Sequence, residues 1–123
     1  MNFVNVFKLC FKSKHGEILF FIAILTHTPE LCLGRPEHRE EAKQMMEFMK
    51  NIDDFAKDAD VKLHGFYSNS NEHTSFIILE TDNYLKVGKF LGEGPILTHH
   101  TGRIIPVASL EETLAFAESI VEE

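Results

Sequence analysis

The spacing of hydrophobic positions differs along the chain and distinguishes the segments that we expect to form strands from those that we expect to form helices. An apolar run over 18–25 predicts a strand buried on both faces, which extends to about Thr28 and ends before Pro29. Pro36 and the acidic residues after it mark the start of a helix over 36–58, because its apolar residues then recur every three or four positions. The first part of the chain therefore predicts a strand followed by a long amphipathic helix.

The rest of the chain predicts a hairpin, a short helix, a further strand and a closing helix. These elements are two strands over 61–68 and 74–81 joined by a polar turn at 69–72, a helix over 84–91 capped by Thr81 or Asp82, a strand within 96–108 that is strongest over 103–107, and a helix over 110–121. Pro106 cannot donate to a ladder, so its strand should lie at a sheet edge or carry a bulge. Ser109 and Glu112 form a capping box for the last helix.

This order of elements is that of a ferredoxin-like α+β domain, the split βαβ pattern with a C-terminal helix. It predicts a four-stranded antiparallel sheet in the order 4-1-3-2, in which we expect the first and third strands to run parallel in the middle. The helices can cover only one face of such a sheet, yet the first and third strands are apolar on both. A second copy of the sheet would bury the other face, so we expect a homodimer.

The length bounds the domain organisation, because 123 residues correspond to one domain. We assign 18–123 to the ferredoxin-like domain and 1–17 to an N-terminal extension, either an extra strand or a dispensable tail. Two cysteines, Cys10 and Cys32, do not suggest a disulfide scaffold and are expected as free thiols.

The charge balance of the chain argues against one class of binding partner. Twelve basic and 19 acidic side chains give a formal net charge of −7, which repels phosphate backbones and argues against nucleic acid. The apolar run over 18–25 is far shorter than the roughly 20 residues of a membrane span. Glu17 abuts it and no signal-cleavage pattern follows, so we expect a cytoplasmic protein that does not bind a membrane.

The second half of the chain resembles a group of small domains of unknown function. The segments 61–67, 76–82 with its Glu80-Thr81-Asp82, and 103–107 with its terminal Pro-Val are similar to GYD-like domains of the dimeric α+β barrel superfamily. The superfamily includes cofactor-free monooxygenases, haem-degrading enzymes, muconolactone-isomerase-like proteins and stress-response domains. The resemblance implies the fold over about 18–108 and dimerisation, and it transfers no particular chemistry.

Seven histidines are the most distinctive candidates for chemistry. With strands one and three parallel, their carboxyl ends would meet the amino ends of strands two and four at one edge. We expect His27, His64, Glu80, His99 and His100 at that edge, with Cys32 in the loop above it. His73 is expected at the opposite end, and His15 and His38 lie outside the four strands.

These residues support three interpretations that the sequence leaves open. His27, Cys32, His64, His99 and His100 could ligate zinc, copper, nickel or iron, whereas His27, His64, Tyr67, Glu80 and His99 could line a pocket for a small-molecule ligand. A histidine beside Glu80 could instead act as the base of a cofactor-independent monooxygenase or isomerase. Alternatively, the histidines only form hydrogen bonds within a structural or regulatory interaction module, since none has the spacing of a standard metal motif.

Overall fold

The computed structural model describes residues 19–92 and 96–122, which form an α+β fold; the proposed extension over 1–17 lies outside the described residues. The elements in chain order are β1 (Leu19–Thr26), the 3-10 turns η1 (Pro29–Leu31) and η2 (Pro36–His38), α2 (Arg39–Lys50), α3 (Ile52–Asp58), β2 (Lys62–Asn69), β3 (Thr74–Thr81), α4 (Tyr84–Leu91), α5 (Ile96–His99), β4 (Thr101–Val107) and α6 (Leu110–Val121).

The four strands form one sheet in the order β2-β3-β1-β4, which confirms the predicted order read from the other edge. Every neighbouring pair is antiparallel, so the expectation that the first and third strands run parallel was wrong. The reason is that β2 runs in the same direction as β1 and the β2–β3 hairpin then reverses the chain. The carboxyl ends of β1 and β2 therefore lie with the amino ends of β3 and β4.

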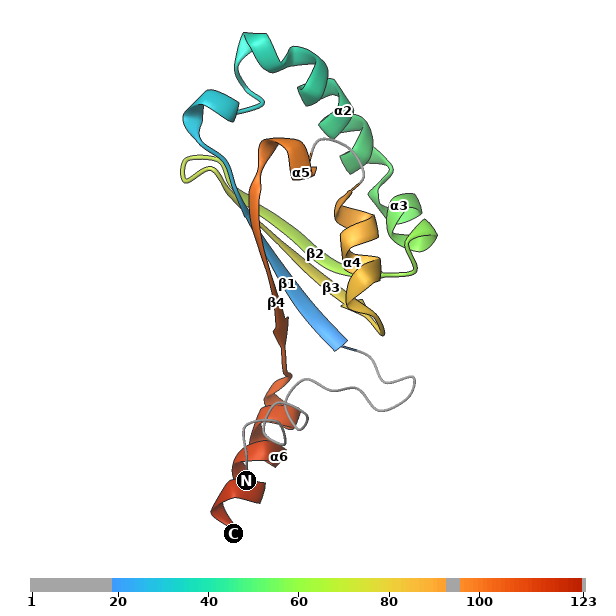
Figure 1. Ribbon diagram of the computed structural model, residues 1–123, viewed down its shortest axis with the longest axis vertical. Helices are drawn as coiled ribbons and strands as arrows, with labels where there is room; N and C mark the ends of the chain where they lie inside the picture. The colour runs from blue at the N-terminus through green and yellow to red at the C-terminus, as the bar shows by residue number, and fades with distance from the viewer. Residues whose placement is uncertain (1–18, 93–95, 123) are drawn as a thin grey trace.

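One face of the sheet carries the hydrophobic core. Alternate residues of β1 and β3 are buried against α2, α3 and α4, which cover this face in Figure 1. Phe48 of α2 lies at the centre of the helical layer, with its ring centroid 5.2 Å from that of Phe55 in α3 and 5.6 Å from that of Phe90 in α4. The three aromatic rings hold the helices together above the sheet.

Local hydrogen bonds decide where the helices begin and end. The single helix expected over 36–58 is divided into η2, α2 and α3, with a break at Asn51, whose side-chain amide donates to the Glu47 carbonyl at 2.9 Å. Asn83 caps α4 in place of Thr81 or Asp82, because its side chain accepts from the Leu85 amide at 2.8 Å. The capping box of Ser109 and Glu112 is confirmed at the start of α6.

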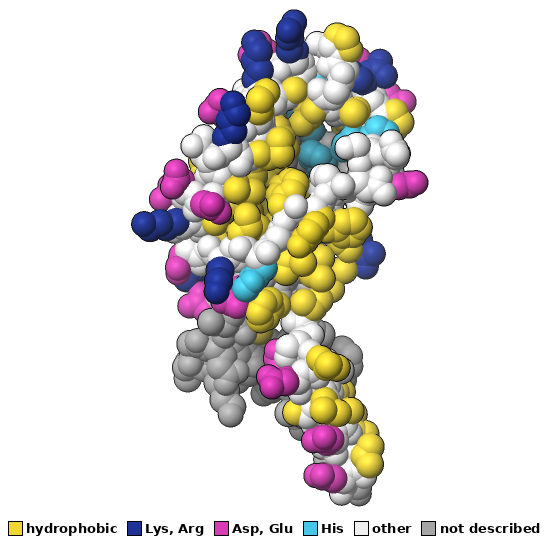
Figure 2. Space-filling view, turned by 180° about the vertical axis from the view of Figure 1, so that it is seen from behind, with side chains coloured by type: hydrophobic (Ala, Val, Ile, Leu, Met, Phe, Trp, Pro, Cys, Tyr) yellow, Lys and Arg dark blue, Asp and Glu magenta, His cyan; other side chains and the backbone are white. Residues whose placement is uncertain are grey.

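The other face of the sheet is mostly apolar, and none of the helices that the structure describes lies over it. The register places two charged residues on this face, Glu80 beside Phe20 and Arg103 beside Ile24. Its eight apolar residues lie side by side, namely Phe20, Ile22, Ile24, Tyr67, Phe76, Ile78, Ile105 and Val107. We call these eight residues the open face. Figure 2 shows hydrophobic side chains gathered over this side of the molecule. Gly65 leaves room for the Tyr67 ring, which lies back across the glycine. A Cβ at position 65 would lie only 2.6 Å from Cε2 of Tyr67.

The edges of the sheet and its last helix complete the fold. β4 is an edge strand, which agrees with the position predicted from Pro106. After β4, α6 extends away from the sheet and its helices (Figure 1), and its apolar residues Leu110, Leu114 and Val121 are exposed. None of the helices within 19–92 and 96–122 is long and apolar enough to span a bilayer.

Replacing Phe48 with alanine should destabilise the fold strongly, because it removes the buried ring that joins α2, α3 and α4. We expect the free energy of unfolding in urea to fall by about 3–5 kcal/mol. The matched control is Met49→Ala, whose side chain is exposed in the same helix and should cost less than about 1 kcal/mol. Equal losses in the two variants would contradict this description of the core.

Candidate functional site

Three histidines meet where β1 ends, because the antiparallel register brings three chain segments to that point. Thr26, the last residue of β1, pairs with Thr74 at the start of β3 and with Thr101 at the start of β4. The residue after β1 and the residues before β3 and β4 are all histidines: His27, His73 and His100. Figure 1 shows the end of β1, the β2–β3 hairpin and α5 at this same end of the sheet.

His27 and His73 face each other directly. Nδ1 of His73 lies 3.0 Å from Nε2 of His27, and the His27 amide donates to the His73 carbonyl at 3.3 Å. His73 has a φ of 52°, in the left-handed region that glycine adopts with less strain. Backbone conformations of this kind are found more often at functional sites than elsewhere, and here the imidazole is held against His27.

Cys32 reaches the same point from the loop after β1. It follows η1, and its amide donates to the Pro29 carbonyl at 3.3 Å. Its thiol is free, and Sγ and one ring nitrogen each of His27 and His73 all lie within 4.8 Å of one another. We call His27, Cys32 and His73 the first cluster. It opens into a hollow of about 150 Å³, lined also by the β2–β3 turn and by Gly34.

His100 completes the surroundings of His27. The two rings are in edge contact, with centroids 5.0 Å apart at 84°, and Nδ1–H of His100 donates to the Ile96 carbonyl at 3.0 Å. Burial lowers the pKa of His27 below its ordinary value, and the neighbouring His100 and His73 lower it further. Burial also lowers the pKa of His100. Both shifts favour the neutral form of the rings, which is the form that ligates metals.

Comparison with known proteins adds nothing to this geometry. The chain matches no protein-family model, no curated protein and no solved structure. The interpretation of the site therefore depends on its own residues.

The structure brings together only some of the residues that the sequence analysis placed at one edge. His27, Cys32 and His100 do converge, but they do so with His73, whose exclusion from this end was wrong. His64 and Glu80 lie at the opposite end of the sheet, where Nε2 of His64 is 3.1 Å from Oε1 of Glu80 and its ring contacts Phe20. The direction of β3 explains both errors. Because β3 runs antiparallel to β1, the first residues of β3 lie beside the end of β1, and the last residues of β3 lie beside the start of β1.

The two other candidates lie elsewhere. Tyr67 belongs to the open face and is 62% exposed. His99 contacts the ring of His38 rather than that of His27. One feature of the sequence does indicate the position of His73. His73 directly precedes the strand that follows a tight turn, as His100 directly precedes β4.

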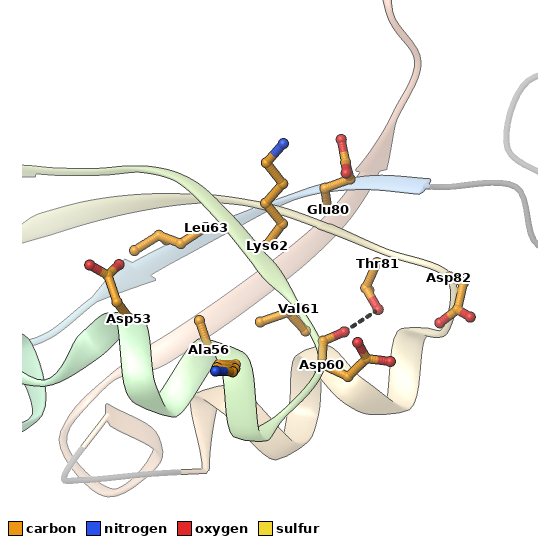
Figure 3. A pocket seen from close by; sticks show the side chains of 10 residues that line it. Asp53, Ala56, Asp60, Val61, Lys62, Leu63, Glu80, Thr81 and Asp82 are labelled. Atoms are coloured by element: carbon orange, nitrogen blue, oxygen red, sulfur yellow. Dashed lines mark hydrogen bonds between the residues drawn. The ribbon is translucent and has the colours of Figure 1, made fainter.

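A larger hollow lies at the other end of the sheet between α3, β2 and β3, and it is a weaker candidate. Its volume is about 570 Å³, and it is lined by carboxylates, two lysines and apolar residues, most of which Figure 3 labels. Lys86 pairs with both Asp60 and Asp82, and the Thr81 hydroxyl donates to the Asp60 carbonyl at 3.2 Å. These groups are thus already satisfied by one another, and the hollow contains no histidine or cysteine.

The lowered pKa values predict how stability depends on pH in chelator-treated protein. In the unfolded chain His27 and His100 titrate near 6.5, but in the folded protein their pKa values are lower. The unfolded state therefore binds more protons below about pH 6.5, and stability that is fully present above this pH should be lost as the pH falls through the folded pKa values. Urea unfolding of the wild type and His27→Gln at pH 7.5 and 5.5 should show a smaller loss in the variant. An identical loss would show that His27 does not contribute.

Proposed function

We propose that this protein binds a transition-metal ion through the first cluster, as a small metal-binding domain. The observation that carries the proposal is the convergence of two imidazole nitrogens and one thiol from three separate segments of the chain. The β1–β3 register places His27 beside His73, whereas the thiol of Cys32 reaches them from a separate loop that no strand pairing holds there.

The spacing of the ligand atoms supports metal binding. Two nitrogens bound at 2.0–2.1 Å to a tetrahedral zinc ion lie roughly 3.3 Å apart. Nε2 of His27 and Nδ1 of His73 are 3.0 Å apart, so an ion could replace the hydrogen bond between them with little movement. Sγ of Cys32 lies within 4.8 Å of both, so it would have to approach by about 1 Å at most, and it lies in a loop.

The ligand types indicate which ions the site would prefer. A thiolate with imidazoles suits zinc or copper better than magnesium or calcium. Three protein ligands leave one tetrahedral position for water or a small anion, and the hollow of about 150 Å³ has room for several water molecules. His100 lies beside His27, and its bond to Ile96 leaves Nε2 as the nitrogen with a lone pair.

Cobalt(II) added to chelator-treated protein should report on the thiolate directly. We expect a thiolate-to-cobalt charge-transfer absorption that is lost in Cys32→Ser and weakened at least tenfold in apparent affinity in His73→Ala. His64→Ala is the matched control, because His64 lies at the other end of the sheet and should leave the absorption unchanged. A wild-type protein without this absorption would contradict the proposal.

We also propose that two copies associate through the open face. The support is that Phe20, Ile22, Ile24 and Ile78 of the central strands and four further apolar residues lie on a sheet face that no described helix covers. A contiguous apolar surface of this kind is unusual on a monomer and is typical of an interface. A second open face is the simplest complementary surface, because a two-fold dimer contacts the same residues from both sides.

Analytical ultracentrifugation of the wild type should give twice the chain mass of 14.1 kDa. Ile78→Glu places a charge in the middle of the open face and should give the mass of one chain. Leu85→Glu is the control, because Leu85 is a 76% exposed apolar residue of α4 and should leave the dimer intact. A monomeric wild type, or an Ile78→Glu variant that remains dimeric with unchanged affinity, would contradict this interface.

A further inference from the structure

A second group of potential ligands lies beside the first cluster but shares no residue with it. It consists of His38 at the end of η2, Glu41 in the first turn of α2 and His99 at the end of α5. One ligand atom from each lies within 4.8 Å of the other two. The rings of His38 and His99 are in edge contact, with centroids 5.3 Å apart at 85°. We call these three residues the second cluster.

His38 is oriented as a metal-binding histidine usually is. Its Nε2 lies 2.8 Å from the carbonyl of Glu30, so Nε2 carries the proton and donates it. Nδ1 is then the nitrogen with a lone pair. Metal-binding histidines typically donate their second ring N–H to a carbonyl or carboxylate in this way, which fixes the ring and its tautomer.

Glu41 differs from its acidic neighbours in its surroundings. Glu37 pairs with Arg35, and Glu40 pairs with Lys43 at 3.3 Å, so each of these carboxylates has a cation beside it. Within the part of the chain that the structure describes, Glu41 forms no ion pair with a lysine or arginine. It is also only partly exposed and lies next to two imidazoles instead. Its charge is thus available to neutralise a cation held by His38 and His99.

From this geometry we propose that His38, Glu41 and His99 form a second metal site, which takes a divalent first-row ion through nitrogen and oxygen ligands alone. Two histidines and one carboxylate are the ligand set of non-haem iron(II) centres, and the same ligands also bind zinc. The site lacks a thiolate, so its ion should be harder than that of the first cluster. The two sites are neighbours, because His99 belongs to the second cluster and the adjacent His100 contacts His27 of the first cluster.

A cobalt(II) titration of the chelator-treated full chain tests this, with bound cobalt measured by equilibrium dialysis and the charge-transfer absorption recorded in parallel. The wild type should bind two cobalt ions per chain, of which only one produces thiolate-to-cobalt absorption. Glu41→Gln should lose one bound ion and keep that absorption unchanged. Glu40→Gln is the matched control, one residue away and paired with Lys43, and it should bind as the wild type does. Circular dichroism of the metal-free variants verifies that each is folded.

The outcomes separate this site from the first cluster. One cobalt per chain with full charge-transfer absorption, unchanged in Glu41→Gln and in His38→Gln, would overturn the second site and leave the first standing. One cobalt without that absorption, lost in Glu41→Gln, would support the second site and overturn the first. No bound cobalt would overturn both.

Discussion

The antiparallel pairing of β1 with both β3 and β4 is the constraint on which the rest of the structure depends. β1 is hydrogen-bonded along both edges, and its register is fixed because Phe21, Ala23 and Leu25 must face the helices. A slip of one residue would turn these side chains to the other face. The same register places the end of β1 beside the starts of β3 and β4. The meeting of His27, His73 and His100 is therefore a direct consequence of how the core is packed.

The pairing also gives the sheet two different faces. Buried residues of β1 and β3 meet α2, α3 and α4, whereas the residues between them form the open face. A strand that is apolar on both sides usually lies between two layers, and the residues over 19–92 and 96–122 supply only one of them. The proposed dimer would supply the second layer. The first cluster lies at the end of the sheet and not on the open face, so association and metal binding would use separate parts of the surface.

Much of the fold could be predicted from the sequence, because hydrophobic periodicity and capping residues act locally. The order of strands, the edge position of β4 and the capping box at Ser109 all follow from such patterns and are confirmed. The break at Asn51 and the cap at Asn83 were not predicted. In both places a side-chain amide forms a hydrogen bond with a nearby backbone group, and several polar residues at those positions could have done so.

The candidate site could be predicted only in part, because its residues depend on strand direction. His27, Cys32 and His100 were recognised by residue type, but the direction assumed for the third strand placed Glu80 where the structure has His73. Once β3 is reversed, His64 and Glu80 move together to the far end as a hydrogen-bonded pair. The second cluster could not be found from sequence, since His38 and Glu41 belong to a helix start that reaches α5 only through tertiary packing.

Zinc-edge X-ray absorption tests the central claim, that this register builds a metal site with one thiolate, most directly. The sample is Glu41→Gln with one equivalent of zinc, in which the second cluster is disabled. The account predicts one sulfur at about 2.3 Å together with nitrogen ligands at about 2.0–2.1 Å. A first shell of nitrogen and oxygen only, identical to that of the same protein carrying Cys32→Ser, would contradict it.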